Sequence, residues 1–196
     1  MLSSLHAVKC WSESRNTSCG RQSVLLDGED WRRVFDSFRS EAWRFEAQPT
    51  YTMPREAENV ARFLRGEPRP PDHNARWHER VRGYVAAKRW IGRVRVVRRP
   101  LTEYQRYQFA WGIPGNIAAG EDIRVLDVTD SDYGLPLTGQ DWWMFDRSRV
   151  VHLNFRPDGT QINRELYEGD PGQHVEWQRV AMRHAVPFEE YVKARR

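Results

Sequence analysis

Two segments of this chain are apolar on both sides of an extended strand. In WWMFD (142–146), the adjacent side chains of Trp142 and Trp143 point to opposite sides, because successive side chains of a strand alternate. GEDIRVLDV (120–128) has the nearly continuous apolar character of a strand that is covered on both faces. Together these segments predict a sheet with helices on both of its faces.

Helix and strand patterns alternate along the rest of the chain. Helical spacing of apolar residues predicts helices over residues 28–38, 54–64, 74–90, 101–111 and 171–192. Period-two alternation predicts further strands over residues 43–47, 92–97, 147–155 and 160–166. The helix after Pro100 is expected to end at Gly-Ile-Pro-Gly, and the last helix to run unbroken through HAVPFEEYV. Residues expected on the inner sides of these elements include Val60, Phe63, Leu64, Val81, Val85, Ile162, Leu166, Val180, Ala181 and His184.

The order of these elements indicates the fold class. Helix-linked strands favour parallel pairing, whereas the closing strands, joined by the turn RPDGT, form an antiparallel meander. We therefore expect an α/β fold, mixed α+β in detail, with one mixed sheet, a C-terminal strand meander and helices on both faces. The length of 196 residues predicts one globular domain over residues 23–196.

Residues 1–22 lack apolar periodicity and are expected to form a flexible leader that folding does not need. Both cysteines, Cys10 and Cys19, lie in this leader, so neither a zinc site nor a disulfide framework is predicted. The start lacks the apolar core of a signal peptide, and no apolar run approaches the ~20 residues of a membrane span. A cytoplasmic protein without membrane contact is expected.

Motifs for known catalytic chemistries are missing from the sequence. It contains neither the G-x-S-x-G turn of a serine nucleophile nor a glycine-rich phosphate loop. His73 and His78 are five residues apart, which is not the i, i+4 spacing of a helical metal site. The sequence therefore assigns no catalytic residue, no metal and no cofactor.

Six cations lie within residues 88–99 and could contact nucleic-acid phosphates. They are Lys88, Arg89, Arg93, Arg95, Arg98 and Arg99. The alternative is that Arg93 and Arg95 form the polar side of one strand and that the last two are its solvated exit. Without a recognition helix, any direct DNA binding is expected to be weak and to depend on salt.

Two other groups of polar residues are candidates for a binding site. The first brackets the entry to the 120–128 strand, where a loop can present polar groups at a sheet edge; it comprises Asn116, Glu121, Asp122 and Arg124. The second is Trp142, Asp146, Arg149 and His152. The alternatives are a turn with local ion pairs and a sheet centre whose tryptophans are core. If a small acidic ligand binds, Arg124 and Arg149 are the expected arginines, with Asp146 orienting Arg149.

Four motifs carry a resemblance to a known family. They are RVRVV-x-x-P-L-T-x-Y, N-x-x-AGEDIRVL, W-x-FD-x-x-RVV-x-L-x-F and HAVPFEEY, in that order over about residues 25–192. In these motifs the chain resembles the actinobacterial family called domain of unknown function 6879. Members of that family look to be encoded beside helix-turn-helix regulators and their small partner proteins, which implies a regulatory context. The order of helix, RVRVV, GEDIRVL and FD-x-x-RVV also resembles half of a phospholipase-D-like fold, but the H-x-K motif of its reaction is absent.

These observations support three hypotheses about function. The first is a non-enzymatic regulatory or interaction module that acts with a helix-turn-helix regulator, or its small partner protein, or senses a small ligand. The second is an enzyme, a transferase or hydrolase, whose acid–base groups come from Tyr104, Glu121, Asp122, His152 and His184. The third is weak direct binding of nucleic acid.

Overall fold

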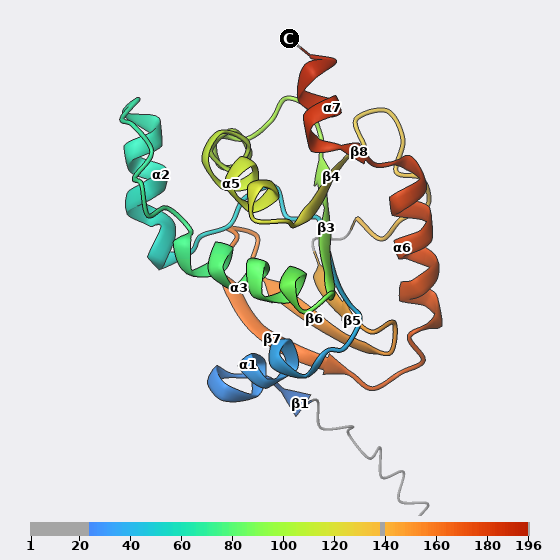
Figure 1. The fold of residues 1–196 in the computed structure, drawn as a ribbon. Helices are drawn as coiled ribbons and strands as arrows, with labels where there is room; N and C mark the ends of the chain where they lie inside the picture. Colours follow the sequence, from blue (N-terminus) through green and yellow to red (C-terminus); the bar gives the residue numbers. More distant parts are fainter. Residues whose placement is uncertain (1–23, 138–139, 196) are drawn as a thin grey trace, which may run out of the picture.

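The computed structural model describes residues 24–137 and 140–195, which form one mixed sheet with helices on both faces (Figure 1). The predicted leader, residues 1–22, lies outside the described residues. The strands are β1 (Val24–Leu25), β2 (Glu41–Glu46), β3 (Trp90–Val97), β4 (Asp122–Asp127), β5 (Asp141–Phe145), β6 (Arg149–Phe155), β7 (Gln161–Tyr167) and β8 (Val186–Pro187). The helices are α1 (Gly28–Ser37), a 3₁₀ turn (Pro54–Glu56), α2 (Ala57–Leu64), α3 (Ala75–Ala86), α4 (Glu103–Tyr107), a π turn (Gln108–Gly112), α5 (Ile113–Ala118), α6 (Gly172–His184) and α7 (Phe188–Lys193).

The strands follow the order β1-β7-β6-β5-β2-β3-β4-β8 across the sheet. β2, β3 and β4 are parallel to one another, and α3 lies between β2 and β3 in the chain, as expected for a helix-linked crossover. β5, β6 and β7 form the predicted antiparallel meander. The expected mixed α+β fold is thereby confirmed.

Both faces of the sheet are covered by helices. On one face, Trp143 and Phe145 pack with residues of α1 and α3. On the other, Trp142 and Met144 pack with Ala181 of α6. Figure 1 shows α6 on the opposite side of the sheet from α1, α3 and α5. The alternation predicted for residues 142–145 is confirmed, and β5 is buried along its whole length.

Two predicted helix ends were wrong, both near prolines. The helix does not stop at Gly-Ile-Pro-Gly but continues through the π turn into α5. Pro114 lies in the first turn of α5, where its missing N–H interrupts no hydrogen bond of that helix. The last helix does break, at Ala185, and Val186–Pro187 pair with β4 as β8 before α7 begins. Proline disfavours helical conformation in the preceding residue, which explains this interruption.

Four residues expected on inner sides are exposed instead. Leu64 and Val85 lie near helix ends, and Ile162, which is 56% exposed, lies on β7 beyond the residues that β1 pairs. His184 is exposed at the end of α6, where it stacks on Tyr133. Among the described residues, no helix is long and apolar enough to cross a membrane.

Candidate functional site

A row of charged side chains crosses the sheet on the face that α1 and α3 cover. We call it the ion ladder, and its members are Glu121, Arg93, Glu46, Arg44 and Asp141. Register explains it: Arg44 of β2 lies opposite Arg93 of β3 and Trp143 of β5, so their side chains share one face.

Each arginine of the ion ladder bridges two carboxylates. Arg93 lies 2.6 Å from Glu121 and 3.2 Å from Glu46, measured between guanidinium nitrogen and carboxylate oxygen. Arg44 lies 3.4 Å from Glu46 and 2.8 Å from Asp141. The arginine side chains are only 17% (Arg44) and 10% (Arg93) exposed, and the carboxylates are buried. The ion ladder is therefore a desolvated network, in which ion pairs are stronger than at a surface.

The electrostatics keep the ion ladder charged. Burial alone would raise the pKa of Glu46, but the charges of Arg44, Arg93 and Arg95 outweigh burial and lower this pKa to about 2. Burial likewise would lower the pKa of Arg44, and the neighbouring carboxylates hold it well above its ordinary value instead. Three arginines, with Arg95 included, balance three carboxylates.

The two terminal carboxylates are also engaged by uncharged donors. Asp141 accepts hydrogen bonds from the backbone N–H groups of Ala47 and Gln48, at 2.8 and 3.1 Å, and from the Tyr51 hydroxyl. Glu121 accepts one from the indole of Trp77 at 2.9 Å. A general base needs an acceptor within reach of substrate. These carboxylates are committed to the protein's own donors, which favours a structural role for Glu121.

Arg95, two residues after Arg93 on β3, lies beneath the π turn. It is fully buried; its Nε donates to Gln108 at 2.9 Å and its Nη1 to the carbonyl of Glu46 at 3.0 Å. Within residues 24–137 and 140–195, its Nη2 has no hydrogen-bond partner. Gln108 opens the π turn, a geometry that is rare and often found at functional sites.

The 116–124 candidates point to opposite sides of the sheet. Asn116 is buried near α3, where its side-chain oxygen lies 3.0 Å from His78 Nε2 and accepts from Asn74 at 3.3 Å. Asp122 and Arg124 alternate with Ile123, so they face away from the ion ladder and pair with each other at 3.5 Å. The structure thus brings Glu121, but not Arg124, to the charged network.

Trp142 and His152 meet on the α6 face. His152 Nε2 lies 2.9 Å from Nε2 of His174 in α6, and the rings of Trp142, Tyr167 and Trp177 surround His174 with centroids 4.8 to 5.0 Å away. Burial and the neighbouring His152 lower the pKa of His174 to about 4, and burial lowers the pKa of His152. The sequence offered no signal for His174, which lies 22 residues away.

Asp146 and Arg149 lie at the β5–β6 turn and do not form the expected pair. Asp146 accepts hydrogen bonds from the backbone of Arg39, Ser40 and Glu41. Burial would raise its pKa, but these backbone donors lower it to about 2. Arg149 is exposed and donates to the Ser37 hydroxyl at 3.1 Å. Asp146 therefore stabilises the entry to β2.

The six cations of residues 88–99 do not form one surface. Arg93 and Arg95 are covered by protein, as described above. Lys88 and Arg89 precede β3, whereas Arg98 and Arg99 follow it, and eight strand residues at ~3.3 Å each separate the pairs. Arg89 is held by the carbonyl of Phe38 at 3.0 Å.

Tyr104 belongs to an aromatic cluster on the sheet side of α2. We define the aromatic cluster as Tyr51, Tyr104, Tyr107 and Trp111. Burial and the nearby Glu56 raise the pKa of Tyr104, whose hydroxyl donates to Glu56 at 2.5 Å.

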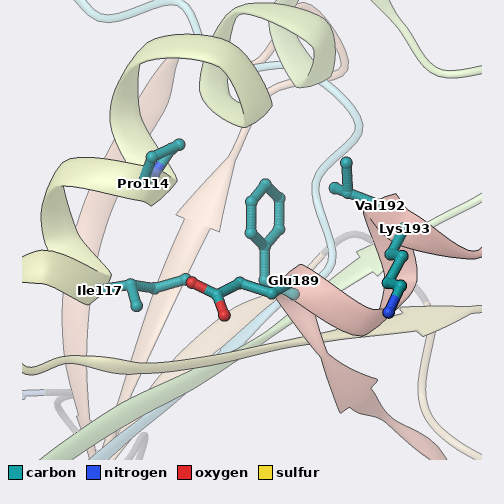
Figure 2. A pocket seen from close by; sticks show the side chains of 6 residues that line it. Pro114, Ile117, Glu189, Val192 and Lys193 are labelled. Carbon is teal, nitrogen blue, oxygen red and sulfur yellow. The ribbon is translucent and has the colours of Figure 1, made fainter. Parts of the chain in front are cut away.

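An open hollow lies between α5 and α7, and we call it the α5–α7 groove. Its volume is about 420 Å³, and it is lined by Pro114, Ile117, Phe188, Glu189, Val192 and Lys193. Figure 2 shows Pro114 and Ile117 of α5 on one side of the groove and Val192 and Lys193 of α7 on the other. The HAVPFEEY motif contains Phe188, but nothing in it signalled a groove because its partner wall lies about 70 residues earlier.

No group of three or more His, Cys, Asp or Glu side chains in the described part of the chain could hold a metal ion. His73 and His78 have different partners, Tyr107 and Asn116 respectively.

The chain matches a known protein family. The family model described as "Domain of unknown function (DUF6879)" matches residues 29–193, which is most of the chain. No curated protein matches.

Proposed function

The chain belongs to the DUF6879 family, and from this premise we propose that it is a non-enzymatic interaction module that docks a helix-turn-helix regulator or that regulator's small partner protein. The partner class follows from the regulatory context that the family resemblance implies. The docking surface we propose is the α5–α7 groove.

The composition of the groove carries this proposal. Its walls are apolar at Pro114, Ile117 and Val192, and it has one carboxylate, Glu189, and one amine, Lys193. Apolar walls with charges beside them match the anatomy of a protein interface, where a partner's apolar side chain enters and polar groups surround it. A partner helix can present such side chains at i and i+4.

The polar residues support this proposal over an enzyme. Glu121 accepts a hydrogen bond from Trp77, and Asp141 accepts one from Tyr51. Each carboxylate also forms an ion pair with an arginine. Substrate would have to displace these partners before either carboxylate could accept its proton. Neither carboxylate lines the α5–α7 groove.

Titration calorimetry tests the proposal with the helix-turn-helix regulator whose gene lies nearest the gene of this chain, and with its small partner protein. We expect saturable binding to one of them. Lys193→Glu reverses an exposed charge of the groove and should weaken binding about tenfold, while Val192→Glu places a charge on its wall and should abolish binding.

Ile162→Glu is the matched control, because Ile162 is an exposed apolar residue on β7. It should bind as the wild type does. The proposal fails if neither protein binds, or if the Lys193 and Val192 variants bind as tightly as Ile162→Glu.

A further inference from the structure

Residues 54–66 pack loosely on the rest of the molecule, since none of them is buried. We call them the α2 flap; they comprise the 3₁₀ turn, α2 and the two residues that follow α2. All eight residues of α2 are described, and none of them is buried. Leu64 is 49% exposed, and Figure 1 shows α2 at the outer edge of the molecule. Val60 and Phe63 of α2 pack against the aromatic cluster.

A hydrogen bond ties the α2 flap to α4: the Tyr104 hydroxyl donates to Glu56, in the 3₁₀ turn, at 2.5 Å. A second bond fixes His73, which lies outside the flap, since the Tyr107 hydroxyl lies 2.8 Å from its Nε2. Both tyrosines belong to α4, three residues apart. A hydrogen bond that is exchanged for one with water contributes little net free energy, so the bond between Tyr104 and Glu56 acts as a latch that can open.

Phe63 occupies an aromatic seat in the closed flap. Its ring centroid lies 5.9 Å from that of Tyr107 and 5.7 Å from that of Trp111, spacings typical of paired rings. His73 packs on the same two rings, with both centroids 5.8 Å away. If the flap moves out, this seat is left for another planar ring.

His73 supplies an unused polar atom at this seat. It is 8% exposed, and in the part of the chain that the structure describes its buried Nδ1 has no hydrogen-bond partner. A buried polar atom without a partner is destabilising, so a ligand atom that pairs with it is favoured. Burial lowers the pKa of His73, which keeps the ring neutral. The charged groups that act on His73 include both signs, Arg69 against Glu56 and Asp72, so the seat suits an uncharged ligand.

We propose that the α2 flap opens to expose the aromatic cluster as a binding site for an uncharged planar heteroaromatic molecule. The ring of this ligand replaces Phe63 against Tyr107 and Trp111, and a nitrogen on its edge pairs with His73. The site is separate from the α5–α7 groove.

Benzimidazole is the probe, and cyclohexanol is the control that lacks a planar ring. Binding to the full chain is measured by calorimetry, and benzimidazole should bind at least about tenfold more tightly. Tyr104→Phe keeps the ring but removes a latch, so the open population rises and the apparent dissociation constant for benzimidazole falls about fivefold. A ligand site that needs no opening would show no such tightening.

Tyr191→Phe is the matched variant, because the Tyr191 hydroxyl donates to Asp127 at 2.8 Å, away from the flap. It should leave the affinity for benzimidazole unchanged. In hydrogen exchange, residues 57–64 should exchange about fivefold faster in Tyr104→Phe and at the wild-type rate in Tyr191→Phe. The proposal is overturned if benzimidazole binds no better than cyclohexanol, if Tyr104→Phe fails to tighten binding, or if Tyr191→Phe has the same effect.

Discussion

Charged side chains are withdrawn from water in the ion ladder but exposed in the α5–α7 groove. In the ion ladder, five charged side chains are withdrawn from water and matched to one another. In the groove, the apolar side chains are reachable, and the charges of Glu189 and Lys193 remain exposed beside them.

This difference indicates which parts of the molecule are available to a binding partner. Charges that are matched inside a protein contribute to a unique arrangement of strands, and removing one partner leaves the others buried and unpaired. An open apolar surface contributes little to the fold and is available to a partner. Charged residues chosen as functional candidates can therefore be structural, and apolar ones functional.

Breaking the ion ladder should have the largest effect on stability. Glu46→Gln keeps the shape of the side chain but leaves Arg44 and Arg93 each with one carboxylate, and should lower the free energy of unfolding by about 3 to 5 kcal/mol. Met144→Leu, a volume-conserving change on the opposite face, should cost less than about 1.5 kcal/mol. Urea unfolding of both variants measures this. Equal losses of unfolding free energy in the two variants would contradict the large contribution expected of the ion ladder.

As the pH falls, the stability contribution of His174, on the α6 face, should be lost before that of the ion ladder. The pKa of His174 is about 4 in the folded protein, below its ordinary 6.5, so the unfolded chain takes up its proton first as pH falls. About 3 kcal/mol of stability, present above pH 6.5, is therefore lost between pH 6.5 and 4. Glu46, with a pKa of about 2 against an ordinary 4.5, loses its contribution only below pH 4.5.

His174→Phe tests this order, since it removes the titrating group while keeping a ring among the aromatic neighbours. Unfolding free energies measured from pH 4 to 7 should then fall less steeply in acid than those of the wild type. Met144→Leu, which removes no titrating group from the same face, should leave the slope unchanged. A slope that His174→Phe does not alter would contradict this assignment.

The smallest effect is expected at a surface ion pair. Arg124 and Asp122 are about one-third exposed and 3.5 Å apart, so Arg124→Ala should cost less than about 1 kcal/mol. Arg149→Ala, at another exposed position, should cost as little. Thermal unfolding measures both. A loss as large as that of Glu46→Gln would erase the distinction between the ion ladder and the surface pairs.

Much of the fold could be predicted from local patterns. The alternation of residues 142–145 predicts a strand that is buried on both faces, and the spacing of Val81 and Tyr84 predicts the inner side of a helix. These predictions hold because side-chain direction follows directly from the strand or helix period. Helix ends at Pro114 and Pro187 were wrong because one proline has different effects in a first turn and in a helix interior.

The candidate site was less predictable because it depends on strand order. Arg93 and Arg95 alternate with valines and therefore look like the exposed side of a strand. Their partner Glu46 is almost 50 residues earlier and meets them only because β2 pairs with β3. Arg44 and Asp141 were missed for the same reason, and His174 because a helix brings it to His152. Local spacing contains no information on these contacts.

The most direct test of the account is a hydrogen-exchange footprint of the chain with and without the bound helix-turn-helix regulator or its small partner protein. The account predicts slower exchange in residues 113–118 and 188–193, which form the two sides of the groove, and unchanged exchange in residues 41–46 of the ion ladder. Protection confined to other surfaces, with residues 113–118 and 188–193 unchanged, would contradict it.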